Sequence, residues 1–221
     1  MDRFTKYQII ASICVALFIT STAMCILAKN NTIYNRCYEQ YYEETHQQIK
    51  GFPIKSPAEV ALYYKQLSES FTDFFEKGYD ISGYELTKEN TQKLNDIKVY
   101  YKLAVVVLVV TLIVGCYAMW FISKRRMYMP LVYGGLLAAL FTSVNSLFLI
   151  FGDNKVFSGV RNMIFEMDYG YFCEGDILQG LFPPEYARWL LVAYVILVLI
   201  LIIFMVLLRQ FILFLGRPHK F

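Results

Sequence analysis

The chain has 221 residues, of which 57% are hydrophobic and only 18% are charged. A soluble domain of this size needs fewer apolar residues for its core, and the two polar segments of the chain are too short to cover four apolar helices. The formal net charge of +3 combines separate acidic and basic segments, so it does not indicate nucleic acid as a partner.

Four stretches without any Asp, Glu, Lys or Arg mark the predicted membrane spans. Each reaches the roughly 20 apolar residues that cross a hydrocarbon core of about 30 Å. We therefore predict an all-α membrane protein with four transmembrane helices and a helical or irregular extracytoplasmic cap formed by two loops. The charge-free stretches are Tyr7–Ala28, Leu103–Ser123, Met127–Gly152 and Trp189–Leu208.

The orientation follows from short basic segments that recur on one side of the spans. The positive-inside rule places these segments, and with them both termini, in the cytoplasm. Of the 18 acidic residues only Asp2 lies on the basic side. The apolar run after Lys6 is longer than the core of a signal peptide and no A-x-A-like site follows it, so we expect an uncleaved anchor. The basic residues are Arg3, Lys6, Lys124, Arg125, Arg126, Arg209, Arg217 and Lys220.

These observations predict eight segments along the chain. In order they are the cytoplasmic N-terminus with transmembrane helix 1 (1–28), an extracytoplasmic domain (29–101), transmembrane helix 2 (102–123), a cytoplasmic loop (124–128), transmembrane helix 3 (129–151), a second extracytoplasmic loop (152–188), transmembrane helix 4 (189–208) and a cytoplasmic tail (209–221).

The first extracytoplasmic segment begins with tyrosines interleaved with glutamates, which predicts a solvated helix at the membrane interface that continues the first span. Ser56-Pro57 then has the form of a helix start. The helix that follows has one apolar, aromatic face, which would pack on the cap, lie in the interface or bind a lipid chain. That face comprises Val60, Tyr63, Tyr64, Leu67, Phe71, Phe74 and Phe75.

A further helix is expected to lead into the second span, capped by Thr87 or Asn90. The spacing of Leu94, Ile97 and Tyr101 predicts its apolar face. The charged residues between them are interpreted as a solvated, salt-bridged helix end.

In the third span, Asn145 should face the bundle interior. The loop of residues 153–188 is too hydrophobic for a free linker, and we expect it to fold onto the first extracytoplasmic segment.

The five cysteines indicate neither a metal site nor a firm disulfide pattern. Cys37 and Cys173 lie one in each extracytoplasmic segment, where a bridge is chemically allowed, but two cysteines carry little pairing information. No C-x-x-C occurs, and the only histidines are His46 and His219, so we predict no metal and no cofactor. The other cysteines, Cys14, Cys25 and Cys116, fall within spans.

Short motifs recur in the two extracytoplasmic segments: KLNDIK at 93–98, an aromatic run at 157–171, GDIL at 175–178 and LFPPE at 181–185. Together they resemble a bacterial integral membrane protein family that includes the lipoprotein intramolecular transacylases. The resemblance implies a location in the bacterial cytoplasmic membrane, with membrane lipids and diacylglyceryl lipoproteins as partners. It also implies transfer of an acyl chain from the glyceryl group of the lipoprotein N-terminal cysteine to that cysteine's amine.

Such a transfer needs a general base, stabilisation of an oxyanion and a dry path for the lipid. The transacylases use two histidines, whose positions are occupied here by Lys93 and Arg161. The resemblance implies Asp96, Lys98, Lys93 and Arg161 as catalytic-site residues, and Phe157, Phe165, Asp168 and Tyr169 as substrate-binding residues.

Three functions remain open from the sequence. The first is a lipoprotein acyltransferase or a divergent relative of one. The second is a non-catalytic membrane protein whose cap binds a lipid, a lipoprotein or a protein. A transporter or channel is favoured least, because no acid or base lies inside any span. The oligomeric state is not predicted.

Overall fold

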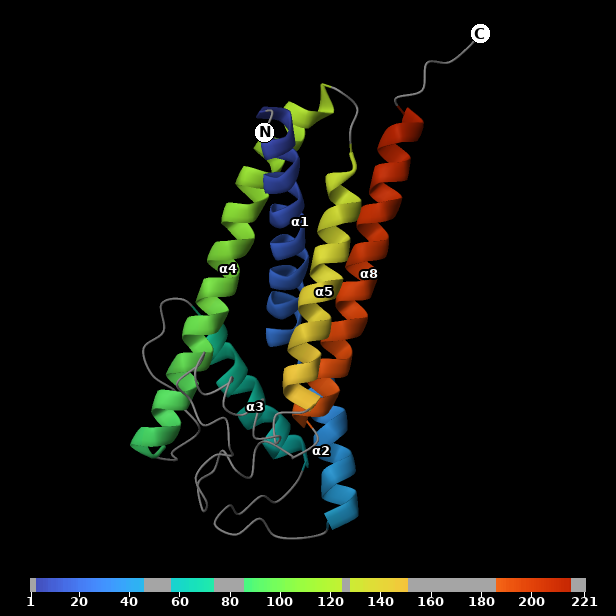
Figure 1. Ribbon diagram of the computed structural model, residues 1–221. Helices are drawn as coiled ribbons and strands as arrows, with labels where there is room; N and C mark the ends of the chain where they lie inside the picture. Colours follow the sequence, from blue (N-terminus) through green and yellow to red (C-terminus); the bar gives the residue numbers. More distant parts are fainter. Residues whose placement is uncertain (1–2, 46–56, 74–85, 125–127, 151–185, 216–221) are drawn as a thin grey trace. The chain divides into compact units, whose positions relative to one another are not determined.

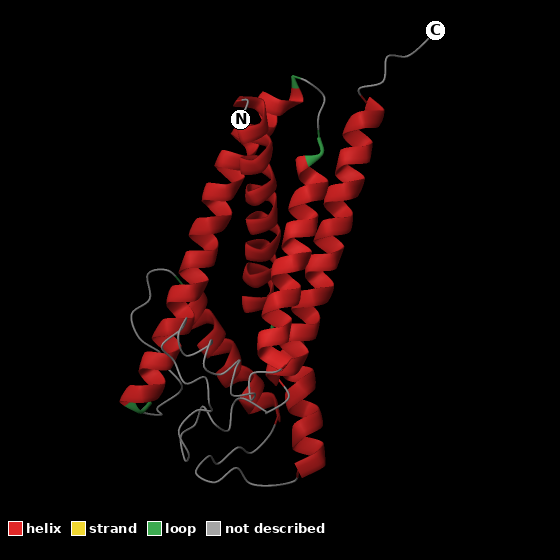
Figure 2. Ribbon diagram, viewed as in Figure 1, coloured by secondary structure: helices red, strands yellow, loops and turns green. Residues whose placement is uncertain are grey.

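The computed structural model describes residues 3–45, 57–73, 86–124, 128–150 and 186–215 (Figure 1). Within these ranges all regular structure is α-helical (Figure 2). The helices are α1 (Arg3–Ala28), α2 (Thr32–Thr45), α3 (Pro57–Thr72), α4 (Lys88–Ser123), α5 (Pro130–Ile150) and α8 (Tyr186–Leu215).

Four of these helices are long and apolar enough to cross a membrane, which confirms the predicted all-α, multi-pass fold. The candidate spans are Arg3–Ala28, Lys88–Ser123, Pro130–Leu147 and Arg188–Leu215. Only 11% of the most apolar stretch of α8 is buried inside the protein. Water would solvate such a surface poorly, whereas lipid solvates it well. α8 also continues past residue 208 to Leu215, so it extends into the predicted tail.

The chain divides into two compact units. The membrane unit comprises Met1–Ala23, Ala104–Glu166 and Tyr194–Phe221, and the tyrosine unit comprises Met24–Leu103 and Met167–Ala193. Helices α1, α4 and α8 contribute residues to both units.

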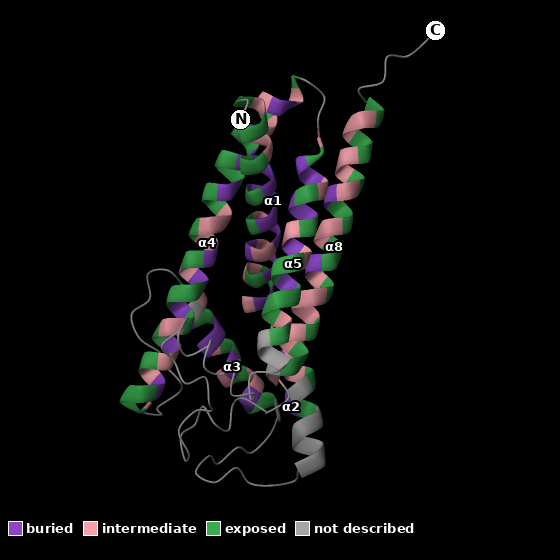
Figure 3. Ribbon diagram, in the orientation of Figure 1, coloured by how far each residue is buried: buried purple, intermediate pink, exposed green. Residues whose placement is uncertain are grey.

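The core of the membrane unit is an apolar cluster from α1, α5 and α8 (Figure 3). Gly134 lies where α5 packs tightly against α1. A Cβ at this glycine would lie 2.5 Å from the Val15 Cβ and 2.8 Å from the Ser12 carbonyl oxygen of α1. The buried members of the cluster are Val15, Ala16, Ile19, Ala23, Leu131, Ala138, Val198 and Met205.

One polar prediction for this unit is wrong. Asn145 is exposed, whereas Thr142, one turn earlier on α5, is buried with 5% of its surface exposed. Residues three apart on a helix are neighbours, but their side chains point in different directions. A cluster of polar residues in the sequence therefore does not show which member faces inward.

The tyrosine unit contains α2, α3, the first half of α4 and the start of α8. α3 begins at Pro57, as predicted. Thr87 caps α4, because its Oγ1 accepts a hydrogen bond from the Asn90 N–H at 3.2 Å. α4 then runs without a break to Ser123, which confirms that the capped helix enters the second span.

Two predictions for this unit are corrected. The tyrosine-rich helix does not continue the first span, because Lys29–Asn31 separate α1 from α2. It is also not solvated throughout, since Tyr34 is 0% and Tyr38 2% exposed. The apolar face predicted for α4 is confirmed at Leu94 and Tyr101, which are 0% and 8% exposed, and wrong at Ile97, which is 38% exposed while Lys98 is buried.

Candidate functional site

Three tyrosines from three helices form the centre of the tyrosine unit. The rings of Tyr34 (α2) and Tyr64 (α3) stack with centroids 3.5 Å apart and planes inclined by 5°. Tyr186, the first residue of α8, meets the Tyr34 ring edge-on, with centroids 5.4 Å apart. The hydroxyl oxygens of Tyr64 and Tyr186 are 2.5 Å apart and share a hydrogen bond. Stacking and hydrogen bonding therefore join α2, α3 and the start of α8.

Burial keeps Tyr34 and Tyr64 protonated. Burial, followed by the neighbouring Tyr38 and Tyr186, raises the pKa of Tyr34 well above its ordinary value. Burial, followed by Tyr186, also raises the pKa of Tyr64. A phenol of this kind can donate a hydrogen bond, but it cannot supply the phenolate that a general base would need near neutral pH.

Lys98, one of the predicted catalytic residues, is used inside the fold. Only 6% of its surface is exposed, and its Nζ donates a hydrogen bond to the Ser70 carbonyl oxygen at 2.7 Å. Ser70 lies in the last turn of α3, where main-chain carbonyls have no partner within the helix. A cation at this end also matches the negative end of the helix dipole. Lys98 therefore closes the C-terminus of α3.

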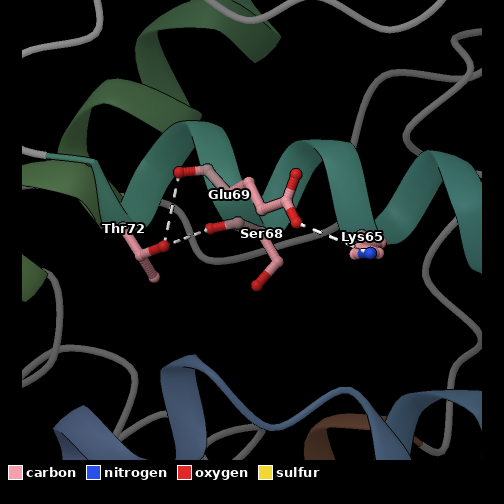
Figure 4. A network of polar contacts seen from close by, with 4 residues as sticks. All are labelled: Lys65, Ser68, Glu69 and Thr72. Atoms are coloured by element: carbon pink, nitrogen blue, oxygen red, sulfur yellow. Dashed lines mark hydrogen bonds and ion pairs between the residues drawn. The ribbon is translucent and has the colours of Figure 1, made fainter.

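Ser68 closes another helix end in the same unit. Its hydroxyl donates to the carbonyl oxygen of Ala28, the last residue of α1, at 3.2 Å. Figure 4 shows two local contacts of α3. Lys65 and Glu69 form an exposed pair at 3.9 Å, and Thr72 donates to the Ser68 carbonyl oxygen at 2.8 Å. The Ser68 hydroxyl thus links α3 to α1, whereas the Lys65–Glu69 pair and the Thr72 hydroxyl act within α3.

Lys93 and Asp96 differ in position from Lys98, although all three belong to one motif on α4. Lys93 forms an ion pair with Glu89 at 3.0 Å, one turn earlier. This pair agrees with the prediction of a salt-bridged helix end. The same prediction is wrong for Lys98, which is buried. Asp96 is half-buried. About 100° separates successive residues of an α-helix, so Asp96 and Lys98 lie about 200° apart around the axis. The structure does not bring these two side chains to one point.

The remaining predicted site residues lie outside the described residues. These are Phe157, Arg161, Phe165, Asp168, Tyr169 and Cys173. Cys37 lies on α2, but its side chain is not among those described. The proposed disulfide and the second half of the predicted site therefore stay predictions.

The amino-acid sequence alone does not predict the cluster of Tyr34, Tyr64 and Tyr186. A partial signal was present, because Tyr34 and Tyr38 are four residues apart and Tyr64 lies on the predicted apolar face of α3. Tyr186 directly follows the LFPPE motif. No periodicity links residues that are 122 positions apart, as Tyr64 and Tyr186 are.

No family model and no curated protein matches the sequence. Solved structures of the membrane integral lipoprotein intramolecular transacylase Lit from Bacillus cereus are similar to the chain. One shares 15% sequence identity, with a TM-score of 0.79 over 95% of each chain. A Lit structure with a histidine-to-arginine substitution has a TM-score of 0.78 at 16% identity over 95% of this chain and 92% of that chain. A histidine-to-alanine form has the same TM-score and identity over 94% and 92%. The resemblance found in the sequence therefore holds at the level of the fold.

Proposed function

We propose, from the fold shared with Lit, that this protein binds the diacylglyceryl-modified N-terminus of bacterial lipoproteins and leaves both acyl chains on the glyceryl group. The similarity over 95% of both chains is the observation that carries the proposal. A protein with the transacylase fold but without the general base can still bind the same lipid-anchored ligand.

The apolar surfaces of the spans support a lipid-anchored ligand. The exposed residues of α4 and α8 are overwhelmingly apolar, and Val109, Ile113 and Ile200 are each about half or more exposed. A diacylglyceryl group lies in the bilayer with its cysteine at the interface, so it can reach the protein laterally without crossing water. Tyrosine, which is frequent in the tyrosine unit, is enriched at the membrane interface, where the cysteine of such a ligand would lie.

The residues at the two histidine positions argue against acyl transfer. The attacking amine must lose a proton to a general base. Lys93 is held in an ion pair with Glu89, and an ammonium in such a pair has hydrogen-bond donors but no acceptor. An arginine such as Arg161 is always charged in proteins. The shared fold does not show whether acyl transfer occurs. Lit structures with a histidine substitution and one without it match this chain with nearly the same TM-score.

Mass spectrometry of lipoprotein N-termini tests the absence of transfer. The full chain is expressed in a bacterial host whose lipoproteins carry diacylglyceryl cysteine with a free amine, and Lit from Bacillus cereus serves as the positive control. We expect the N-terminal peptide to remain diacylglyceryl cysteine with a free amine. Appearance of the N-acyl, monoacylglyceryl form would overturn this part of the proposal and identify an enzyme with a non-histidine base.

A capture experiment tests the binding itself. The detergent-purified protein should retain a lipoprotein that carries the diacylglyceryl group and should not retain the same lipoprotein with its cysteine changed to serine. Asp96→Ala and Arg161→Ala should weaken capture while the expression level stays unchanged. Equal retention of the lipidated and unlipidated forms would contradict a lipoprotein-directed function.

A further inference from the structure

Arg209, near the end of a membrane-spanning helix, has no charged partner among the residues that the structure describes. It lies in the last two turns of α8 and is half-buried. One terminal guanidinium nitrogen donates to the sulfur of Met129 at 3.4 Å, and a thioether is a weak acceptor. The Nε atom is buried and has no hydrogen-bond partner within the described ranges. An arginine stays charged in proteins, so this group needs an anion that the described residues do not provide.

The other described charges of the membrane unit have the same sign. They are Arg3, Lys6 and Lys124, and the described residues of this unit include no Asp or Glu. Met129 directly precedes α5, and the first turn of a helix adds a positive partial charge. No described carboxylate of the membrane unit can therefore neutralise Arg209, and the start of α5, which Arg209 contacts through Met129, favours an anion.

Apolar residues lie on both sides of Arg209 along α8. Met205, one turn earlier, belongs to the apolar cluster of the membrane unit together with Leu131 at the start of α5. Leu207 and Phe211 are 61% and 59% exposed on the outer face of α8. A ligand that combines an anionic group with long apolar chains matches both features.

We propose that Arg209 binds the phosphate of an anionic phospholipid, whose acyl chains lie along the exposed apolar face of α8. The guanidinium has five N–H donors in a planar arrangement and can hold two phosphate oxygens at once. The hydrogen bond to Met129 occupies only one of these donors. Charge neutralisation by the phosphate removes the cost of a cation in apolar surroundings. This site is separate from the tyrosine unit and independent of the lipoprotein proposal.

The test measures thermal unfolding of the full-length protein in detergent during titration with phosphatidylglycerol or phosphatidylcholine. Phosphatidylglycerol should raise the melting temperature of the wild-type protein more than phosphatidylcholine does. In Arg209→Gln we expect about five-fold weaker apparent affinity for phosphatidylglycerol, as is typical for one basic residue at an anionic surface. The affinity for phosphatidylcholine should stay the same. Inorganic phosphate alone should have no effect, and an equal effect of phosphate would overturn a lipid site.

Lys124→Gln is the matched control. It removes one charge of the same sign, which is exposed and lies 4.4 Å from the Trp120 ring centroid. The control should retain the phosphatidylglycerol response. If Lys124→Gln and Arg209→Gln weaken it equally, the response reflects general charge and not a site at Arg209.

Arg209→Lys covers the case in which Arg209→Gln does not fold. This variant keeps the charge but loses the planar pair of donors, so we expect weaker retention of phosphatidylglycerol in native mass spectrometry. Retention equal to that of the wild-type protein would contradict phosphate binding by the guanidinium.

Discussion

The Nζ atom of Lys98 lies 2.7 Å from the main-chain carbonyl oxygen of Ser70, inside a unit where Lys98 is only 6% exposed. This bond joins the first half of α4 to the C-terminus of α3. Lys98, which was expected to take part in catalysis, thus stabilises the packing of α4 on the end of α3.

Lys98→Met should destabilise the protein by about 2 kcal/mol, because a hydrogen bond from a charged donor is lost and a buried carbonyl loses its partner. Lys98→Arg should recover part of this loss, since it can still donate to Ser70. Lys93→Met removes a more exposed i,i+4 ion pair and should cost about 0.5 kcal/mol or less. Unfolding free energies in mixed micelles check the order, and a Lys93 variant as unstable as the Lys98 variant would contradict the role of Lys98.

Gly134→Ala should weaken the packing of α5 on α1. The new Cβ would lie 2.8 Å from the Ser12 carbonyl oxygen, and main-chain atoms cannot move aside as side chains do, so we expect a cost of about 1–3 kcal/mol. Gly135→Ala is the control, because its nearest neighbour is the Ile202 Cγ2 at 3.1 Å. Both changes gain the same helix propensity. The melting temperature should fall only for Gly134→Ala, and equal melting temperatures would show that the helices can separate slightly at no cost.

Tyr64 should stay un-ionised in the folded protein at a pH where unfolded tyrosines titrate, at about pH 10. Its pKa is raised in the folded state, so the folded state retains a proton that the unfolded state loses. The resulting stability is fully present below about pH 10 and is lost as the pH rises towards the folded-state pKa. Tyrosinate absorbance at about pH 11 should therefore be equal in folded wild-type and Tyr64→Phe protein. After denaturation the two should differ by one tyrosinate. A difference of one already in the folded state would show that Tyr64 is accessible to solvent.

The membrane spans and several helix starts could be predicted from the sequence, because each depends on neighbouring residues. A charge-free stretch such as Tyr7–Ala28 has one stable environment whatever the rest of the chain does. The starts at Pro57 and after Thr87 follow from local hydrogen bonding and the fixed φ angle of proline. The sequence was therefore sufficient to predict these features.

Only the tertiary structure decided which side chains face inward and which of them meet. Ile97 and Lys98 are adjacent on α4 and lie about 100° apart, so a small rotation of the helix exchanges them. Lys98 faces inward because its Nζ can donate to the main-chain carbonyl oxygen of Ser70. The contact of Tyr64 with Tyr186 and the contact of Arg209 with Met129 join distant parts of the chain. Such contacts depend on how helices pack, and a local pattern of residues contains no information about them.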